Sequence, residues 1–208
     1  MSCVAILPAR GGSRRIPRKN IKLFHGKPII YYSIKAAQDS GLFDAIYVST
    51  DDAEIASVAK QCGARYMDRT EEFARDEVGT QEIMRQAMLY FDGVSSGPRY
   101  EYACCIYPCS PMLDEEDLRF AYNRLLGWPQ FNYVKIDGWY YFGKAKAFLD
   151  NEPIDDAKSV LSVFPDAERW IDINTPEDWS KAEAMYADLH LNRDIFYGSV
   201  KTGIGMKL

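Results

Sequence analysis

The sequence is poor in the residues on which nucleophilic catalysis and zinc binding depend. It contains only two histidines, His25 and His190, and neither belongs to a Ser/His/Asp set, so we expect both to be structural or exposed. The five cysteines are an odd number and show no zinc-ligand spacing. Cys104 and Cys105 lie inside an apolar run and are expected to be reduced core residues. The pattern therefore argues against a catalytic triad and a cysteine-zinc site.

The sequence also lacks an excess of positive charge and any long hydrophobic run. Its 208 residues carry a net charge of −5, which argues against a general nucleic-acid binder. No apolar run approaches the roughly 20 residues that a membrane-spanning helix needs, and no signal-peptide pattern precedes the first predicted strand. The apolar content of 47% is ample for one core. We therefore expect a cytoplasmic protein with no nucleic-acid or membrane partner.

A basic loop follows the first apolar run. Residues Val4 to Leu7 read as a buried parallel strand, and Pro8 ends it. Gly11 and Gly12 allow the backbone to approach a ligand closely, and successive N–H groups in such a loop can form an anion-binding nest. The cationic side chains of the loop are Arg10, Arg14, Arg15, Arg18 and Lys19. They suit a polyphosphate, although a solvated basic turn is the alternative, since the spacing fits neither common glycine-rich phosphate motif.

The complete string favours the phosphate-binding interpretation. Leu-Pro-Ala-Arg-Gly-Gly-Ser-Arg-Arg-Ile-Pro-Arg-Lys-Asn, residues 7–20, resembles the nucleotide-binding signature of the sialic-acid-type sugar cytidylyltransferases. Residues 21–34 resemble the pseudaminic acid branch of that family. These enzymes couple CTP to a nine-carbon 2-keto sugar acid and release pyrophosphate. The resemblance therefore implies CTP and a sugar acid as partners, and it allows a homodimer, since one family segment often reaches across a dimer.

The resemblance also implies roles for individual residues of the loop. Arg10 and Lys19 would hold phosphates and, with Asp172, form the expected catalytic set. Ser13 and loop amides would orient the phosphates, and Asn20 would bind the ribose. Arg14 replaces the lysine that is usual in the family, which keeps the charge but changes the geometry. The nucleotide-binding residues expected in this loop are Ala9, Arg10, Gly11, Gly12, Ser13, Arg14, Lys19 and Asn20.

Three later residues complete the nucleotide site that the resemblance implies. Arg69 and Thr80 stand where the family has an arginine and a hydroxyl residue that help to hold the nucleotide. Thr80 is also the expected N-cap of a helix over 81–91, and both roles are compatible. Tyr107 precedes Pro-Cys-Ser-Pro, which resembles the family's Pro-Thr-Ser-Pro element. Other members have a cytosine-reading glutamine at this position, and a tyrosine could stack on the base or hydrogen-bond it.

The expected cofactor is Mg²⁺. The family has Asp-Ile-Asp-Thr near the C-terminus, with carboxylates that take part in Mg²⁺ binding, where this chain has Asp-Ile-Asn-Thr, residues 172–175. A predicted strand over Arg169 to Ile173 would put Asp172 and Asn174 on the same face. Asn174 adds no charge, so the metal should be held more weakly than in relatives. Alternatively, Asp172 is only a surface carboxylate. Asp51 matches a family pattern near the site, while Asp52 is expected to cap a helix.

Short strands alternate with helices along the chain. This order predicts a single α/β domain with a doubly wound, mainly parallel sheet, helices on both faces and a Rossmann-like nucleotidyltransferase fold. Ligands of such sheets bind outside the carboxyl ends of the strands. The predicted strands are 4–7, 45–49, 65–67, 102–107, 138–142 and 169–173, and the predicted helices are 28–40, 53–62, 81–91, 114–126 and 175–191. The domain would span 1–191, with a tail at 192–208.

The middle of the chain departs from the family pattern. We expect the sugar-contacting segment of the family to be shortened near 127–142 in this chain, whereas the segments on either side resemble the family. The leading interpretation is transfer of CMP from CTP to a nine-carbon sugar acid, with pseudaminic acid first. The alternatives are another sugar acid (sialic, legionaminic or deoxyoctulosonic) and a nucleotide-binding homologue without catalysis, which Asn174 and the short middle would favour.

Overall fold

The computed structural model of the chain describes residues 2–70, 72–75, 77–93, 100–156, 160–163 and 168–200, with side chains up to residue 189. In this part of the chain, seven strands form a sheet with the order β5-β4-β1-β6-β8-β7-β9. The strands are β1 (Cys3–Pro8), β4 (Ala45–Thr50), β5 (Arg65–Asp68), β6 (Tyr102–Ile106), β7 (Tyr133–Ile136), β8 (Tyr140–Lys144) and β9 (Val160–Ser162). β8 runs antiparallel to β6 and β7, and the other pairs are parallel. The sheet is therefore mainly parallel, as predicted.

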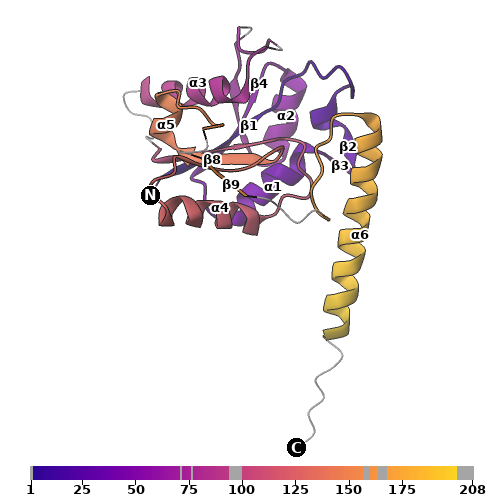
Figure 1. The fold of residues 1–208 in the computed structure, drawn as a ribbon. Coiled ribbons are helices and arrows are strands. Elements are labelled where there is room, and N and C mark those ends of the chain that lie inside the picture. Colours follow the sequence, from indigo (N-terminus) through magenta and orange to yellow (C-terminus); the bar gives the residue numbers. More distant parts are fainter. Residues whose placement is uncertain are drawn as a thin grey trace, which may run out of the picture.

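Helices cover both faces of this sheet, so the predicted α/β class is confirmed (Figure 1). They are α1 (Ile30–Ser40), α2 (Ala53–Gln61), α3 (Thr80–Gly93), α4 (Glu115–Gly127), α5 (Ala145–Leu149) and α6 (Pro176–Val200). α3 and α5 lie on one face, and α1 and α4 lie on the other. A single turn of 3₁₀-helix, η1 (Lys19–Ile21), follows the basic loop.

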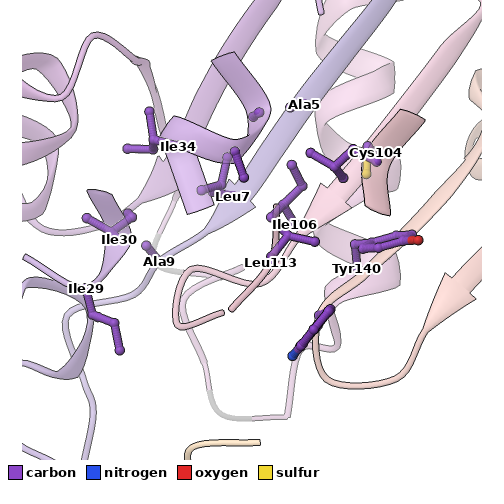
Figure 2. Close-up of a cluster of buried hydrophobic side chains, with 14 of the residues drawn as sticks. Ala5, Leu7, Ala9, Ile29, Ile30, Ile34, Cys104, Ile106, Leu113 and Tyr140 are labelled. Atoms are coloured by element: carbon purple, nitrogen blue, oxygen red, sulfur yellow. The ribbon is translucent and has the colours of Figure 1, made fainter. Parts of the chain in front are cut away.

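The central strand β1 has apolar side chains on both faces, as expected for a parallel strand covered on both sides. Ala5 and Leu7 belong to the core under α1 and α4, whereas Val4 and Ile6 belong to the core under α3 and α5. Figure 2 shows the first core, in which Leu7 lies close to Ile34 of α1. Since both cores are packed on β1, the loop that follows this strand has a rigid base.

A small hairpin replaces the predicted start of the first helix. β2 (Leu23–Phe24) and β3 (Lys27–Pro28) pair antiparallel, and the two residues between them, His25 and Gly26, have φ of 43° and 81°. Positive φ at both central residues is the requirement of a type I′ hairpin turn. Pro28 is therefore the last residue of β3, and α1 begins only at Ile30. The prediction that Pro28 opens the helix was wrong.

Two predictions near the C-terminus also need correction. The expected strand over Arg169 to Ile173 is not formed, and this stretch has no regular secondary structure. The predicted end of the last helix near Leu191 is wrong as well, because α6 continues to Val200 and extends away from the body (Figure 1). The start of α6 was predicted correctly. The backbone N–H of Thr175 donates to Asp178 over 2.8 Å and that of Asp178 donates to the Thr175 hydroxyl over 3.2 Å, which is a capping box.

The described residues contain no helix that is both long enough and apolar enough to cross a membrane. Residues 201–208 of the predicted tail lie outside the described residues.

Candidate active site

The basic loop lines one wall of an open cavity of about 510 Å³. Asn174, from the stretch before α6, lies on the same cavity, so the structure brings the predicted phosphate-binding and metal-binding segments together. The residues that line it are Arg10, Ser13, Arg14, Arg15, Ile16, Lys19 and Asn174. Four cations around one cavity of this size favour the interpretation that the loop binds a compact, highly charged anion over the interpretation that it is a solvated basic turn.

Arg18 also belongs to the basic loop, but it is not among the residues that line the cavity. Its backbone is left-handed, with φ of 55°, and its guanidinium binds the carboxylates of Asp52 and Glu54. Asp52 also caps α2, accepting bonds from the backbone N–H groups of Glu54 and Ile55 at 3.0 Å each. The hydrogen bond from Arg18, followed by these backbone bonds, lowers the pKa of Asp52 to about 2. Asp52 therefore has the predicted capping role and anchors the loop as well.

Gly11 is packed against the turn that follows β4. Its N–H donates to Asp51 Oδ1 over 2.9 Å, and a Cβ atom at this position would lie 2.6 Å from Asp52 Oδ2. The structure thus gives the reason for glycine here: a side chain would collide with the carboxylate that holds Arg18. At Gly12, by contrast, an added Cβ atom would meet no atom within 4 Å among the described residues.

Asn20 is buried and holds the loop from inside. Its Nδ2 donates to the carbonyl oxygen of Arg10 over 2.9 Å, and its Oδ1 accepts a bond from Cys109 Sγ over 3.3 Å. Burial raises the pKa of Cys109 to about 12, so the thiol keeps the proton that it donates. Both ends of the Asn20 amide are engaged within the protein. Asn20 therefore links the loop to the segment after β6, and its predicted contact with a ribose stays a prediction.

Lys19 connects the loop to the stretch that carries Asp172. Its Nζ donates to the carbonyl oxygen of Ile173 over 2.7 Å. Asn174 Nδ2 donates to Asp172 Oδ2 over 2.7 Å, so these two side chains meet even though the predicted strand is absent. Asp172 packs against Gly138, where an added Cβ atom would lie 3.5 Å from that of Asp172.

The donor set at Asp172 fits a magnesium ion that arrives with a nucleotide. Among the described residues, no three His, Cys, Asp or Glu side chains are grouped to hold a metal ion. Mg²⁺ in nucleotide sites is commonly held by one or two protein carboxylates together with phosphate oxygens. Asp172 supplies one carboxylate, and the amide oxygen of Asn174 supplies a neutral donor. The residues present therefore fit a weakly held ion and not a preformed protein cage.

Arg69, Thr80 and Tyr107, the other predicted nucleotide-binding residues, are not among the residues that line this cavity. Arg69 is only 5% exposed, and its Nη2 donates to the carbonyl oxygen of Ser49 over 2.9 Å. Burial lowers its pKa, as does the nearby charge of Arg10. Burial raises the pKa of Tyr107 to about 12, and a hydrogen bond with Thr80 acts in the opposite direction. Thr80 and Tyr107 thus meet, and Arg69 lies within the electrostatic reach of the basic loop.

Sequence reasoning missed Cys109 as a partner of Asn20 and Arg169 as a partner of α4. Arg169 binds Asp114 and Asp117, which lie 55 and 52 residues away in the sequence. Neither contact follows a local motif. The replacement of threonine by cysteine in the Pro-Cys-Ser-Pro string was the one signal present at Cys109.

A family model described as cytidylyltransferase matches residues 4–167. The chain belongs to the cytidylyltransferase family. It is 31% identical to the pseudaminic acid cytidylyltransferase of Campylobacter jejuni subsp. jejuni serotype O:2, over 91% of this chain and 98% of that protein. It is 28% identical to the CMP-N,N′-diacetyllegionaminic acid synthase of Legionella pneumophila, over 93% of this chain and 99% of that protein. The family assignment made from residues 7–34 is therefore confirmed.

The fold of this cytidylyltransferase also matches solved structures. A CMP:2-keto-3-deoxy-manno-octonic acid synthetase complexed with CTP superposes with a TM-score of 0.73, covering 90% of this chain and 99% of that one. The sequence identity is 13%, so this likeness concerns the fold alone. The alignment with the Campylobacter protein spans 231 positions, more than the 208 residues of this chain, and it therefore contains gaps in this chain. Their position near 127–142 stays a prediction.

Proposed function

We propose that this cytidylyltransferase transfers CMP from CTP to a nine-carbon 2-keto sugar acid, with pseudaminic acid as the acceptor. The observation that carries the proposal is the cavity in which four cations of the loop face the Asp172–Asn174 stretch. The match to a pseudaminic acid cytidylyltransferase over 91% of the chain supports the choice of acceptor.

The proposed reaction requires that the two substrates are positioned and that negative charge on the phosphates is neutralised. The anomeric hydroxyl of the sugar acid attacks the α-phosphorus, the bond from that phosphorus to the bridging oxygen breaks, and pyrophosphate leaves as the hydroxyl proton is released. Negative charge grows on the phosphate oxygens, and cations fixed in advance stabilise it. Arg10, Arg14, Arg15 and Lys19 lie around the cavity where these oxygens would bind. Arg69, Thr80 and Tyr107 would hold the nucleoside end.

Mg²⁺ would be held by Asp172 and the Asn174 amide oxygen, and it would neutralise phosphate charge when bound. Because the protein supplies a single carboxylate, the nucleotide should bring most of the ligands. Asp172 must then exchange its bond from Asn174 for the ion, which adds a cost to metal binding. This feature separates the chain from family members with two carboxylates at these positions.

Release of pyrophosphate tests the proposal. The protein is supplied with CTP, Mg²⁺ and one acceptor at a time: pseudaminic, legionaminic, sialic or deoxyoctulosonic acid. We expect the highest kcat/KM with pseudaminic acid. A higher value with legionaminic acid would overturn the choice of acceptor but keep the reaction, and the 28% identity to the legionaminic enzyme makes this acceptor the main competitor.

A second candidate function is nucleotide binding without catalysis. Asn174 in place of a carboxylate and the gapped alignment favour it. Calorimetry that shows CTP binding, together with no pyrophosphate release from any acceptor, would support this reading and overturn the proposed reaction. Sedimentation of the same protein would test the homodimer, which stays a prediction.

A further inference from the structure

We propose that Arg169 is a positioning residue: by binding the first turn of α4, it holds the Asp172–Asn174 stretch against the basic loop. This inference rests on the proposed function, since the loop and the stretch are taken as two walls of one nucleotide site. The stretch from Arg169 to Asn174 has no regular secondary structure, so no backbone ladder fixes it. Side-chain contacts must do so.

The contact of Arg169 with α4 is the anchor at one end. Its Nη1 donates to Asp114 Oδ2 and its Nη2 to Asp117 Oδ1, each over 2.7 Å. All three side chains are mostly buried, with 19%, 24% and 15% of their surfaces exposed. The planar guanidinium can reach two carboxylates at once, which the single ammonium group of a lysine does less well.

The two carboxylates that Arg169 binds are also held by backbone hydrogen bonds. Asp114 Oδ1 accepts from the backbone N–H groups of Glu116 and Asp117 at 3.0 and 3.1 Å, and Asp117 Oδ2 accepts from the N–H of Asp114 at 3.1 Å. These bonds form the capping box of α4. The Trp139 ring centroid lies 5.7 Å from the Arg169 guanidinium and adds a cation–π contact. Arg169 therefore docks onto a preformed support.

Further contacts follow the stretch toward the cavity. Trp170 Nε1 donates to the carbonyl oxygen of Asp137 over 2.9 Å, and Asp172 packs on Gly138. Ile173 is 1% exposed, and its carbonyl oxygen accepts the bond from Lys19. Asp172 lies three residues after Arg169, so a shift of the anchor moves the carboxylate relative to Lys19. The loop itself remains in place, because its supports are β1, Asn20 and Asp52, and only Lys19 among its cations loses a partner when the stretch shifts.

This separation gives the inference a specific signature. Loss of the contact between Arg169 and α4 should weaken the part of nucleotide binding that depends on the Asp172–Asn174 stretch. The part that depends on the basic loop should stay unchanged. Binding of CTP in the presence of Mg²⁺ uses both walls, whereas binding without Mg²⁺ uses mainly the loop. A purely structural role for Arg169 would affect both equally.

The experiment compares Arg169→Lys with a matched variant, Arg119→Lys. Arg119 also fixes α4, donating from Nε to the carbonyl oxygen of Ser40 over 3.1 Å and from Nη2 to that of Asp39 over 2.6 Å, and it is not among the residues that line the cavity. Calorimetry measures CTP affinity with Mg²⁺ and with EDTA, and thermal unfolding measures Tm. For Arg169→Lys we expect a loss of at least fivefold with Mg²⁺ and less than twofold with EDTA. For Arg119→Lys we expect a lower Tm and less than twofold change in either affinity.

Asp117→Asn provides a second route to the same loss, since it removes one partner of Arg169 and keeps the shape of the side chain. Equal losses with Mg²⁺ and EDTA in the Arg169 and Asp117 variants, or no loss beyond that of Arg119→Lys, would overturn the inference. Hydrogen exchange of the backbone from 169 to 174 reports on the anchor without any ligand. It should accelerate in Arg169→Lys and in Asp117→Asn but not in Arg119→Lys, and unchanged exchange in Arg169→Lys overturns the inference. A wild-type protein that binds no CTP, by contrast, overturns the proposed function, and exchange still decides whether Arg169 is the anchor.

Discussion

Lys19 donates a hydrogen bond to the carbonyl oxygen of Ile173 over 2.7 Å, across 154 residues of sequence. The contact joins the basic loop after β1 to the stretch before α6, and it lies between the two walls of the cavity. A nucleotide phosphate would compete with this carbonyl for the Lys19 ammonium group. Binding of the nucleotide is therefore expected to change the contact between the walls, and the following predictions examine each wall.

Arg10→Ala should weaken CTP binding by more than tenfold, because a hydrogen bond between charged groups is worth roughly 1.5–3 kcal/mol. Arg18→Ala is the matched control, since Arg18 belongs to the same loop but binds Asp52 and Glu54. It should lower stability and change CTP affinity much less. Calorimetry measures both. Equal CTP affinities for Arg10→Ala and the wild type, with the fold intact, would refute the assignment of the loop.

Tyr107→Ala should reduce the affinity for CTP more than that for free pyrophosphate, since Tyr107 stands at the predicted base end of the site. Tyr107→Phe keeps the ring and removes the hydroxyl that meets Thr80. Competition binding with both ligands separates stacking from hydrogen bonding. Should both affinities fall together in Tyr107→Ala, or neither fall, the residue serves only the core.

Asn174→Asp should lower the Mg²⁺ concentration needed for pyrophosphate release, because it places a second carboxylate beside Asp172. Asp172→Asn should abolish turnover together with the metal dependence. A new charge next to Asp172 would also raise the pKa of one of the two carboxyl groups, which opposes this gain. An Mg²⁺ titration of Asn174→Asp that shows an unchanged or higher requirement would contradict the idea that Asn174 is the weak point.

Asp52 should make the stability of the protein depend on acid pH. Its pKa is lowered from 3.8 to about 2 by Arg18 and the cap of α2, so its contribution is complete above the unfolded value and is lost as the pH falls toward 2. Asp52→Asn retains a good N-cap residue and removes the charge. Urea unfolding should show a deficit for the variant at pH 7 that shrinks at pH 2.5. A deficit that is the same at both pH values would contradict the ion-pair explanation.

Gly11→Ala should destabilise the loop, whereas Gly12→Ala should be tolerated. The added methyl group would lie 2.6 Å from Asp52 Oδ2 in the first case and would meet nothing within 4 Å among the described residues in the second. Thermal unfolding and CTP binding should both worsen for Gly11→Ala alone. Similar behaviour of the two variants would mean that Gly11 is not packed as the structure shows.

Much of the fold could be predicted because its signals are local. The buried run of β1, the Asp52 cap of α2 and the Thr175–Asp178 box each depend on neighbouring residues, and each is present. The stretch around Ile173 could not be predicted correctly. Its alternating apolar residues look like a strand, but its anchors are side chains that lie far away in the sequence.

For the site, too, local patterns could be predicted from the sequence and contacts between distant residues could not. The loop could be located from a contiguous string, and the meeting of Asp172 with Asn174 was expected for the wrong reason, namely a strand that does not form. The inward role of Asn20 was missed, since its partner Cys109 lies 89 residues away. Local patterns show which residue types are present, whereas tertiary contacts decide which atoms remain available to a ligand.

The reversed direction of β8 decides at which edge of the sheet the turn before it lies. Ile106 at the end of β6 pairs with Tyr140 at the start of β8, so the tight turn before β8 lies at the same edge of the sheet as the basic loop after β1. Asp172 packs against Gly138 of that turn, and the N–H of Tyr107 donates a hydrogen bond to the carbonyl oxygen of Trp139 in the same turn. It is built from a different part of the chain than the basic loop. The two sides of the site are therefore encoded by separate segments, so a substitution in the turn can alter the side that carries Asp172 without changing any residue of the basic loop.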